Sequence, residues 1–349
     1  MGYAVREAAP ADVEADLVAL WTANLHMGGD PRDKYRWFYL GNPLGAAQAF
    51  LVEASGPGDR AVVGTCGLGA RTLLHDGRRW RAGLLADFAL EPAHRTVMPG
   101  LILQRALAAS ARERFDFTYA FPNNAALGIL SRIGYRLLGR TGRYVRPLRL
   151  DSFLRRYLGS RALARLAAAV PNALLAWTDR AKAAWLPRRL HIEWLAHPDP
   201  RFDVLWQRAS GSHAFMGERT AAFLRWRFTE RPGLPGELAA LVDSETGAVR
   251  AYAAVVQKVQ GVALLADFLA DGDDALETLF RLLFPALRSR GFEQATTCFL
   301  GADRIDTLLR DVGFSYRNAA KNVVIDTNRA GPELLRRGDW YLTDADRDN

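Results

Sequence analysis

The stretch Y-R-W-F-Y-L-G-N-P, from Tyr35 to Pro43, decides the fold because the chain contains a second version of it. The second version, L-R-W-R-F-T-E-R-P, runs from Leu224 to Pro232 and keeps the Arg-Trp pair, the later aromatic residue and the proline. Three further pairs of landmarks follow the same order at similar separations: Trp21 and Trp206, L-L-A-D-F at Leu84 and at Leu264, and Gly134-Tyr135 and Gly313-Phe314. This self-similarity indicates a duplicated domain.

Each copy predicts the same order of elements: a helix, an antiparallel meander of strands, a helix, a strand, a short helix and a last strand. In the first copy, Asp76-Gly77 marks a hairpin turn. Pro99 suits the first position of a helix that we expect to run from there to Arg114. The pattern favours an α+β fold, with each copy a mixed, mainly antiparallel twisted sheet flanked by helices.

Length and composition support two domains and exclude several classes of protein. The chain has 349 residues and two cysteines, too few for a disulfide scaffold or a four-cysteine zinc site. No apolar run reaches signal-peptide or membrane-spanning length, so we expect a cytoplasmic protein. The predicted units are a cofactor-binding domain at 1–146, a basic helical connector at 147–190 and a second domain at 191–349.

The segment L-E-P-A-H-R-T-V-M-P-G-L, from Leu90 to Leu101, leaves a strand and enters a helix. Free backbone N–H groups and the positive end of the helix dipole form an anion site at such a junction. Arg95 and His94 lie beside it, and Gly100 removes a side chain where a ligand would approach the backbone. An ordinary strand-to-helix connection is the other interpretation of the same residues.

These residues resemble the GNAT superfamily of acyl-CoA-dependent N-acyltransferases, in a tandem two-domain form. The pyrophosphate loop of that family, Q/R-x-x-G-x-G/A, is similar to Arg95–Gly100, with Met98 in place of a glycine. The later family motif N-x-x-A-x-x-x-Y-x-x-x-G-F is matched at Asn123, Ala126 and Gly134-Tyr135. Leu130 stands where many members have a tyrosine that protonates the departing thiolate.

The resemblance implies two GNAT-like domains and acetyl-CoA, or another acyl-CoA, as the donor. It places the donor on these residues: Phe88, Ala89, Leu90, His94, Arg95, Thr96, Val97, Met98, Pro99, Gly100, Asn123 and Ala126. An oxyanion would be held by a backbone N–H of the strand at 88–90. Asp87 is the candidate general base, and Tyr119 the candidate proton donor in place of Leu130. Because Asp267 repeats Asp87, an inherited structural role is the alternative for that carboxylate.

Trp37 and Asn42 are the candidate contacts to the acceptor. Trp37 is repeated as Trp226, so packing is its other interpretation, whereas Asn42 is replaced by Arg231 in the second copy. No histidines stand at metal-ligand spacing, so we predict no metal site. The second copy has A-D-G-D-D-A at Ala270–Ala275 in place of the loop, and three carboxylates there would repel a pyrophosphate. We therefore expect it to bind no CoA.

The connector is the basic part of the chain. Eight Lys and Arg residues and two Asp residues fall at 151–190, which gives this segment a net charge of +6 out of +8. It predicts two helical stretches broken at Pro171. One interpretation is a helical pair packed on the domains with a solvated charged face, and another is peripheral contact with an anionic membrane. A nucleic-acid surface is a third, which we consider the least expected.

The predicted function is transfer of an acetyl group from acetyl-CoA to an amine acceptor such as an amino sugar or polysaccharide precursor. The acceptor class rests on resemblance to tandem GNAT proteins. One alternative keeps the enzyme class and changes the donor to a long-chain acyl group or to aminoacyl-tRNA, as in Fem-like ligases. A second alternative is a non-catalytic GNAT-like protein that senses a ligand or acts as a scaffold.

Overall fold

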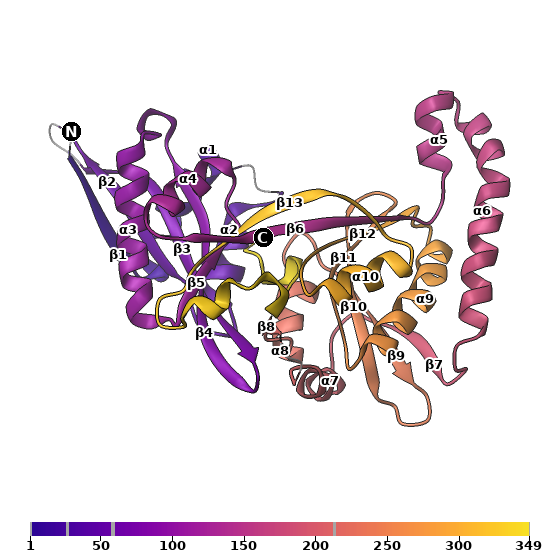
Figure 1. Cartoon of the computed structure of the whole chain (residues 1–349). Helices are drawn as coiled ribbons and strands as arrows, with labels where there is room; N and C mark the ends of the chain where they lie inside the picture. The colour runs from indigo at the N-terminus through magenta and orange to yellow at the C-terminus, as the bar shows by residue number, and fades with distance from the viewer. Residues whose placement is uncertain (1, 26–27, 57–59, 212–213, 349) are drawn as a thin grey trace.

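The computed structural model describes residues 2–25, 28–56, 60–211 and 214–348 (Figure 1). Within them, fourteen strands join one sheet. The strands are β1 (Gly2–Ala8), β2 (Gln48–Ser55), β3 (Arg60–His75), β4 (Arg78–Leu90), β5 (Phe117–Ala120), β6 (Arg136–Pro147), β7 (Leu190–Leu195), β8 (Phe215–Gly217), β9 (Glu237–Asp243), β10 (Val249–Val259), β11 (Val262–Ala270), β12 (Gln294–Gly301), β13 (Ser315–Asp326) and β14 (Trp340–Leu342). The helices are α1 (Glu14–Asn24), α2 (Pro31–Lys34), α3 (Val97–Arg114), α4 (Asn124–Arg132), α5 (Asp151–Leu158), α6 (Arg161–Ala184), α7 (Arg201–Ala209), α8 (Ala221–Leu224), α9 (Asp273–Ser289) and α10 (Asp303–Asp311).

The sheet is mixed and mainly antiparallel, as the sequence predicts. Its order is β1-β2-β3-β4-β5-β13-β6-β12-β11-β10-β9-β7, and β8 and β14 pair with each other beside this path. The parallel pairs are β4 with β5, β11 with β12, and β8 with β14. The hairpin between β3 and β4 turns at Asp76 (φ 47°) and Gly77 (φ 73°), where the sequence predicts it.

The two halves of the chain exchange their last strands. Strand β13 of the second half lies between β5 and β6, and β6 of the first half lies between β13 and β12. In Figure 1, β6 and β13 run side by side across the middle of the molecule. The domain boundaries at residues 146 and 191 stay a prediction, and the sheet crosses between the halves without a break.

The repeated Trp residues form the centre of the contact between the halves. Trp37 and Trp226 stack with ring centroids 4.9 Å apart. The Nε1–H of Trp37 donates to the carbonyl oxygen of Trp226 (2.7 Å), and the Nε1–H of Trp226 donates to that of Trp37 (2.8 Å). Each Trp lies on a π-helical turn, at 35–40 and 225–229. The two copies therefore meet through the same motif in a reciprocal arrangement.

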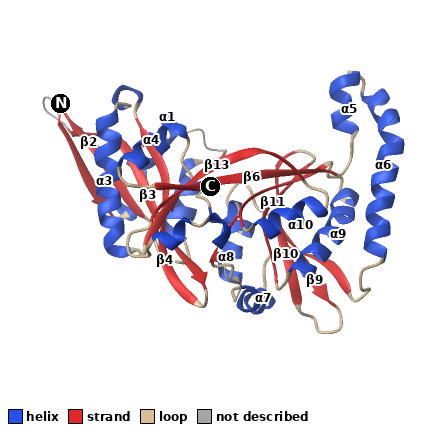
Figure 2. Ribbon diagram, viewed as in Figure 1, coloured by secondary structure: helices blue, strands red, loops and turns tan. Residues whose placement is uncertain are grey.

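A different long helix covers the sheet in each half. In the first half α3 packs against β1, β2, β3 and β5, and in the second half α9 packs against β7, β9, β10 and β11. Beyond α9, the helices α5 and α6 form a pair at one end of the molecule (Figure 2).

The predicted break of the connector at Pro171 is wrong. Helix α6 continues through Pro171, and the break lies at Gly159, whose φ of 66° ends α5. Ser160 then caps α6 by accepting a hydrogen bond from the N–H of Leu163 (3.4 Å). Because proline removes a single intrahelical donor, a long and otherwise favourable helix can include it, whereas the left-handed glycine reverses the chain.

Candidate active site

A cavity of about 630 Å³ opens where β4 and β5 separate. The strands pair from Ala82 with Phe117 to Leu84 with Tyr119, and no pair follows. Beyond that point, residues 85–88 of β4 line the cavity. Its opposite wall comes from the second half of the chain, including residues 231–234. The cavity therefore requires both halves.

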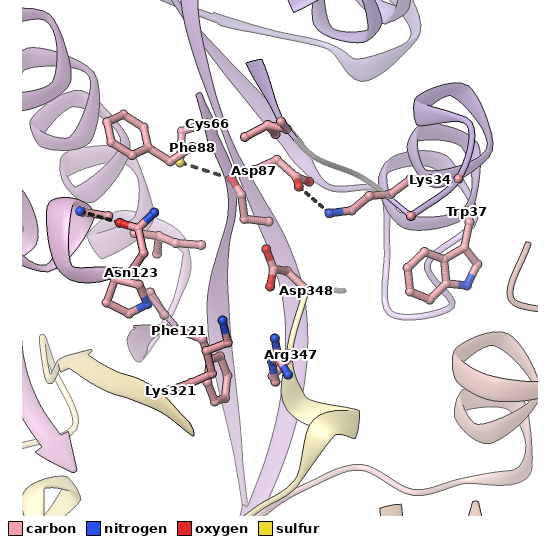
Figure 3. A pocket seen from close by; sticks show the side chains of 18 of the residues that line it. Lys34, Trp37, Cys66, Asp87, Phe88, Phe121, Asn123, Lys321, Arg347 and Asp348 are labelled. Carbon is pink, nitrogen blue, oxygen red and sulfur yellow. Dashed lines mark hydrogen bonds and ion pairs between the residues drawn. The ribbon is translucent and has the colours of Figure 1, made fainter. Parts of the chain in front are cut away.

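Asp87 lies at a bulge of β4 and faces this cavity (Figure 3). Asp87 and Phe88 together oppose one residue of β3, and the φ of Asp87 is 51°. Opposite the bulge, a Cβ added to Gly67 would lie 2.0 Å from the hydroxyl oxygen of Tyr39. This glycine is thus required for the Tyr39 hydroxyl to approach Asp87.

The Asp87 carboxylate has two partners. Lys34 Nζ forms an ion pair with Oδ1, and the Tyr39 hydroxyl donates to Oδ2 at 3.3 Å. Burial raises the pKa of Asp87 above the ordinary aspartate value, against the opposing effect of Lys34. A carboxylate with a raised pKa at the end of a cavity is suited to accept a proton from a substrate.

Asp267, the counterpart of Asp87 in the second copy, has a different environment. It is fully buried, and its Oδ2 accepts hydrogen bonds from Arg219 Nε (2.8 Å) and from the Tyr252 hydroxyl (2.5 Å). Its Oδ1 accepts from the Thr343 hydroxyl (2.5 Å). The aspartate at this repeated position therefore has a structural role in the second copy, whereas in the first copy it faces a cavity.

Cys66 also lines the cavity, but it is not a reactive thiol. Burial raises its pKa to about 12, so the side chain is neutral at pH 7. The Gln104 amide donates to its sulfur at 3.3 Å.

The predicted donor loop lies outside the lining of the cavity and is exposed. Helix α3 begins at Val97, and the side chain of its N-cap residue, Thr96, makes no capping hydrogen bond. Arg95 fixes the loop by donating to the carbonyl oxygen of Leu90 (3.0 Å) and to Asn24 Oδ1 (3.0 Å). The uncapped first turn of α3 therefore keeps the character of an anion site.

The remaining loop residues fall into two groups. The side chains of Val97 and Met98 are exposed, while Ala89, Leu90, Pro99 and Gly100 are buried. His94 Nδ1 lies 3.0 Å from the Tyr3 hydroxyl.

Phe88 links the donor loop to the cavity. Its ring lies 3.2 Å from a Cβ built on Gly100, and it also lines the cavity. Asn123 and Ala126 line the cavity from the start of α4, where Asn123 Oδ1 accepts from the N–H of Ala126 (2.9 Å). Leu130, in place of the family tyrosine, forms part of the same wall. The end of β4, the donor loop and the start of α4 are therefore adjacent.

The candidate proton donor and one of the candidate acceptor contacts also lie outside the cavity lining. Tyr119 is 1% exposed, and its hydroxyl donates to the carbonyl oxygen of Asp346 (3.1 Å), so we no longer assign it a proton-transfer role. Asn42 is 5% exposed, donates to the carbonyl oxygen of Ala70 and accepts from the N–H of Leu44. It stabilises a turn. Trp37 does line the cavity, although it also forms the contact between the halves.

Several lining residues were not identified from the sequence. They are Lys34, Arg231, Lys258, Lys321, Arg347 and Asp348. For Lys34 the sequence held a signal. At the repeat spacing Lys34 corresponds to Phe223, so the two copies differ at a position that lines the cavity in the first copy. The others come from separate loops and strands with no shared motif. Arg347 and Asp348 enter the cavity on the C-terminal segment (Figure 3).

The second-half wall carries an excess of positive charge. Arg231 lies over the Trp37 ring at 5.3 Å, and neither Arg231 nor Lys258 forms an ion pair with a described residue. Desolvation lowers the pKa of Lys258, and the charge of Arg231 lowers it further. Desolvation also lowers the pKa of Arg231, with Arg347 as the next cause. This wall can therefore hold an anionic group.

Two of the three acidic residues that replace the loop in the second copy pair with arginines. Asp271 pairs with Arg250 at 2.5 Å, and Asp273 pairs with Arg304. That this copy binds no CoA stays a prediction.

The described residues hold neither a metal-binding cluster nor a membrane-spanning helix. They contain no group of three or more His, Cys, Asp and Glu residues placed to hold a metal ion. No helix within this part of the chain is both long enough and apolar enough to cross a membrane.

Comparison with known proteins gives structural neighbours. No protein-family model matches the sequence. No curated protein matches it either. A GCN5-related N-acetyltransferase from Anabaena variabilis superposes with a TM-score of 0.62 at 12% identity, covering 94% of this chain and 74% of its own. N-myristoyltransferase from Saccharomyces cerevisiae, solved with bound myristoyl-CoA, gives a TM-score of 0.57 at 12% identity and coverages of 96% and 88%.

A tandem GNAT protein from the clavulanic acid biosynthesis pathway matches over both halves. It gives a TM-score of 0.52 at 16% identity, with coverages of 95% of this chain and 99% of its own. This match covers both halves of the duplicated sequence, which together form one mixed sheet. The chain therefore has the tandem GNAT fold.

Proposed function

We propose that the protein is an N-acyltransferase that uses an acyl-CoA donor, most simply acetyl-CoA, and an amine acceptor. The observation that carries the proposal is Asp87: it lies at the bulge of β4, faces the cavity and is partnered by Lys34 and Tyr39. Its repeat counterpart, Asp267, is closed off by an arginine. The cavity of the first copy therefore has the acid–base group that an amine acceptor requires.

In the proposed reaction, the donor phosphates bind at the first turn of α3, and the acyl thioester reaches the cavity past Phe88. Asp87 takes a proton from the ammonium group of the acceptor, and the free amine attacks the thioester carbonyl carbon. Backbone N–H groups of β4 beyond Leu84, which β5 leaves unpaired, can stabilise the oxyanion. The C–S bond then breaks, and the second proton of the attacking nitrogen passes through water to the departing thiolate, since Leu130 has no proton to give; the products are the amide and the free CoA thiol.

We further propose that the acceptor carries an anionic group. The support is the pair Arg231 and Lys258 on the wall opposite β4, together with the absence of an ion pair to either among the described residues. An amino sugar bearing a carboxylate or phosphate fits this description. The sugar itself rests on resemblance to tandem GNAT proteins.

The first experiment is calorimetric titration of the full chain with acetyl-CoA. Saturable binding is expected, and Arg95→Glu should weaken it at least tenfold, because it removes the loop contacts to Leu90 and Asn24 and adds a negative charge at the anion site. Arg79→Glu makes the same charge change on the exposed β3–β4 hairpin and should bind like the wild type.

Each other outcome has a defined meaning. Wild-type chain that binds neither acetyl-CoA nor myristoyl-CoA would contradict the acyl-CoA proposal and favour a non-catalytic role or an aminoacyl-tRNA donor. Binding of myristoyl-CoA alone would keep the enzyme class and replace the acetyl donor.

A further inference from the structure

Helix α6 carries an apolar stripe on its outer surface. Leu163, Leu166, Val170, Leu174 and Trp177 are 56%, 76%, 78%, 59% and 66% exposed. Their spacing of three, four, four and three residues puts all five on one face of the helix. Large apolar side chains at this exposure are normally scattered, so a continuous row marks an interaction surface.

The stripe points away from the rest of the protein. The buried residues of α6 are Ala164, Ala168 and Asp179, which lie on the opposite face. Asp179 fixes that inner face, because its two oxygens pair with Arg146 Nη2 of β6 and Arg288 Nη2 of α9, each at 2.6 Å. The helix thus packs through small residues and a buried ion pair. The apolar side chains of the stripe therefore do not pack on the domains, although the helix itself contacts α9.

Aromatic side chains extend the apolar surface beyond the stripe. On α5, Phe153 and Tyr157 are 54% and 74% exposed, with ring centroids 5.2 Å apart. Trp185, directly after α6, is 90% exposed. Exposed Trp and Tyr beside an apolar helix face are typical of segments that lie at a membrane–water interface. Figure 1 shows that α5 and α6 form the end of the molecule, where no other element overlies them.

The charge of the segment indicates whether a second copy of the chain or a lipid surface binds here. The segment 151–190 has a net charge of +6, and seven of its eight basic side chains form no ion pair with a described residue, Arg189 being the exception. A second copy docked on the stripe would bring +6 against +6. An anionic lipid surface complements this charge at about 1 kcal/mol per basic residue near the membrane.

We propose that α5 and α6 form a membrane-binding element that lies in the interface of an anionic bilayer, with the apolar stripe facing the acyl chains. Since no described helix can span a bilayer, the contact is peripheral. The rest of the chain is then held at the lipid surface. This inference rests on the exposed stripe and its charge and is independent of the acyl-transfer proposal.

Co-sedimentation of the full chain with vesicles tests it. Vesicles of phosphatidylcholine and of phosphatidylcholine with 25% phosphatidylglycerol are compared. The wild type is expected to bind the anionic vesicles at least tenfold more tightly than the neutral ones, with binding weakened by salt. The double variant Leu166→Gln, Val170→Gln is expected to lose at least tenfold. Leu137→Gln, Val204→Gln, which alters two exposed apolar residues elsewhere (54% and 45%), is the matched control and should bind normally.

Three results would overturn the proposal. The first is that the wild type does not bind anionic vesicles. The second is that the stripe variant and the control lose binding equally. The third is that the wild type forms a dimer without vesicles and the stripe variant is a monomer. The last result, read by sedimentation equilibrium, would assign the stripe to a second copy of the chain. Circular dichroism of both variants checks that they are folded.

Discussion

At the scale of the residue, Asp87 and Asp267 differ in their access to the cavity. Both occupy the same place on equivalent strands, and both are surrounded by hydroxyl donors. The partner cation differs: Lys34 leaves Asp87 open to the cavity, whereas Arg219 is itself 1% exposed and closes over Asp267. At the repeat spacing Lys34 corresponds to Phe223 and not to Arg219, so the two aspartates take their partner cations from different positions of the repeat.

Replacing Asp87 by Asn is expected to lower kcat by roughly 10²- to 10⁴-fold, the usual contribution of a general base. The wild-type kcat/KM should rise with pH as Asp87 loses its proton. This rise, the acidic limb of the pH–rate profile, should occur at a pH above the ordinary aspartate pKa, because burial raises the pKa of Asp87. The variant should lack the limb. A pH–rate profile of both proteins measures this, and an unchanged profile in the variant would assign the base to another group.

The cationic wall makes a separate prediction about the acceptor. Lys258→Met removes the charge and keeps the length of the side chain, so the KM for an anionic acceptor should rise about tenfold or more while kcat changes little. Lys258→Arg should restore most of the affinity. Steady-state kinetics with matched acceptors, with and without the anionic group, provide the measurement. An equal effect on both acceptors would contradict a charge contact.

At the scale of the element, the helical pair depends on one buried carboxylate. Asp179 of α6 is 5% exposed and accepts from arginines of β6 and α9. Asp179→Ala would leave two arginines unpaired at the inner face of α6, and loss of one member of a buried ion pair destabilises by about 3–5 kcal/mol. Equilibrium denaturation should show this loss. Glu245→Ala, whose side chain is 66% exposed and pairs with Arg189 on the surface, serves as the control and should cost less than about 1 kcal/mol.

The sequence predicts where helices, strands and turns lie better than it predicts which of them contact one another. The hairpin at Asp76-Gly77 was predictable because its turn chemistry is local. Asp87 was a candidate because the family resemblance places it on the separating strand, whereas the repeat of L-L-A-D-F favoured a structural role. The opposite wall was not predictable. Arg231, Lys258 and Arg347 are distant in sequence, and long-range strand pairing alone brings them to one cavity. Hydrophobic alternation identifies a strand, but not which strand it pairs with.

At the scale of the whole molecule, the exchanged strands make the two copies one folding unit. Neither half can complete its sheet alone, because β13 closes the first half against β5, and β6 pairs with β12 of the second. The Trp37–Trp226 contact adds a buried aromatic pair with reciprocal hydrogen bonds at the same junction. The placement of the cavity between the halves follows from this arrangement, since each half supplies one wall.

A single cooperative unfolding transition is therefore expected, despite two copies of ordinary domain size. Fluorescence and far-ultraviolet circular dichroism should give the same midpoint in denaturant. Trp226→Ala should lower the free energy of unfolding by about 3–5 kcal/mol and shift that one transition as a whole. Because the exchanged strands tie the copies together, loss of the Trp contact should not resolve it into two steps. Two separate transitions, in the wild type or in the variant, would show instead that the copies fold independently.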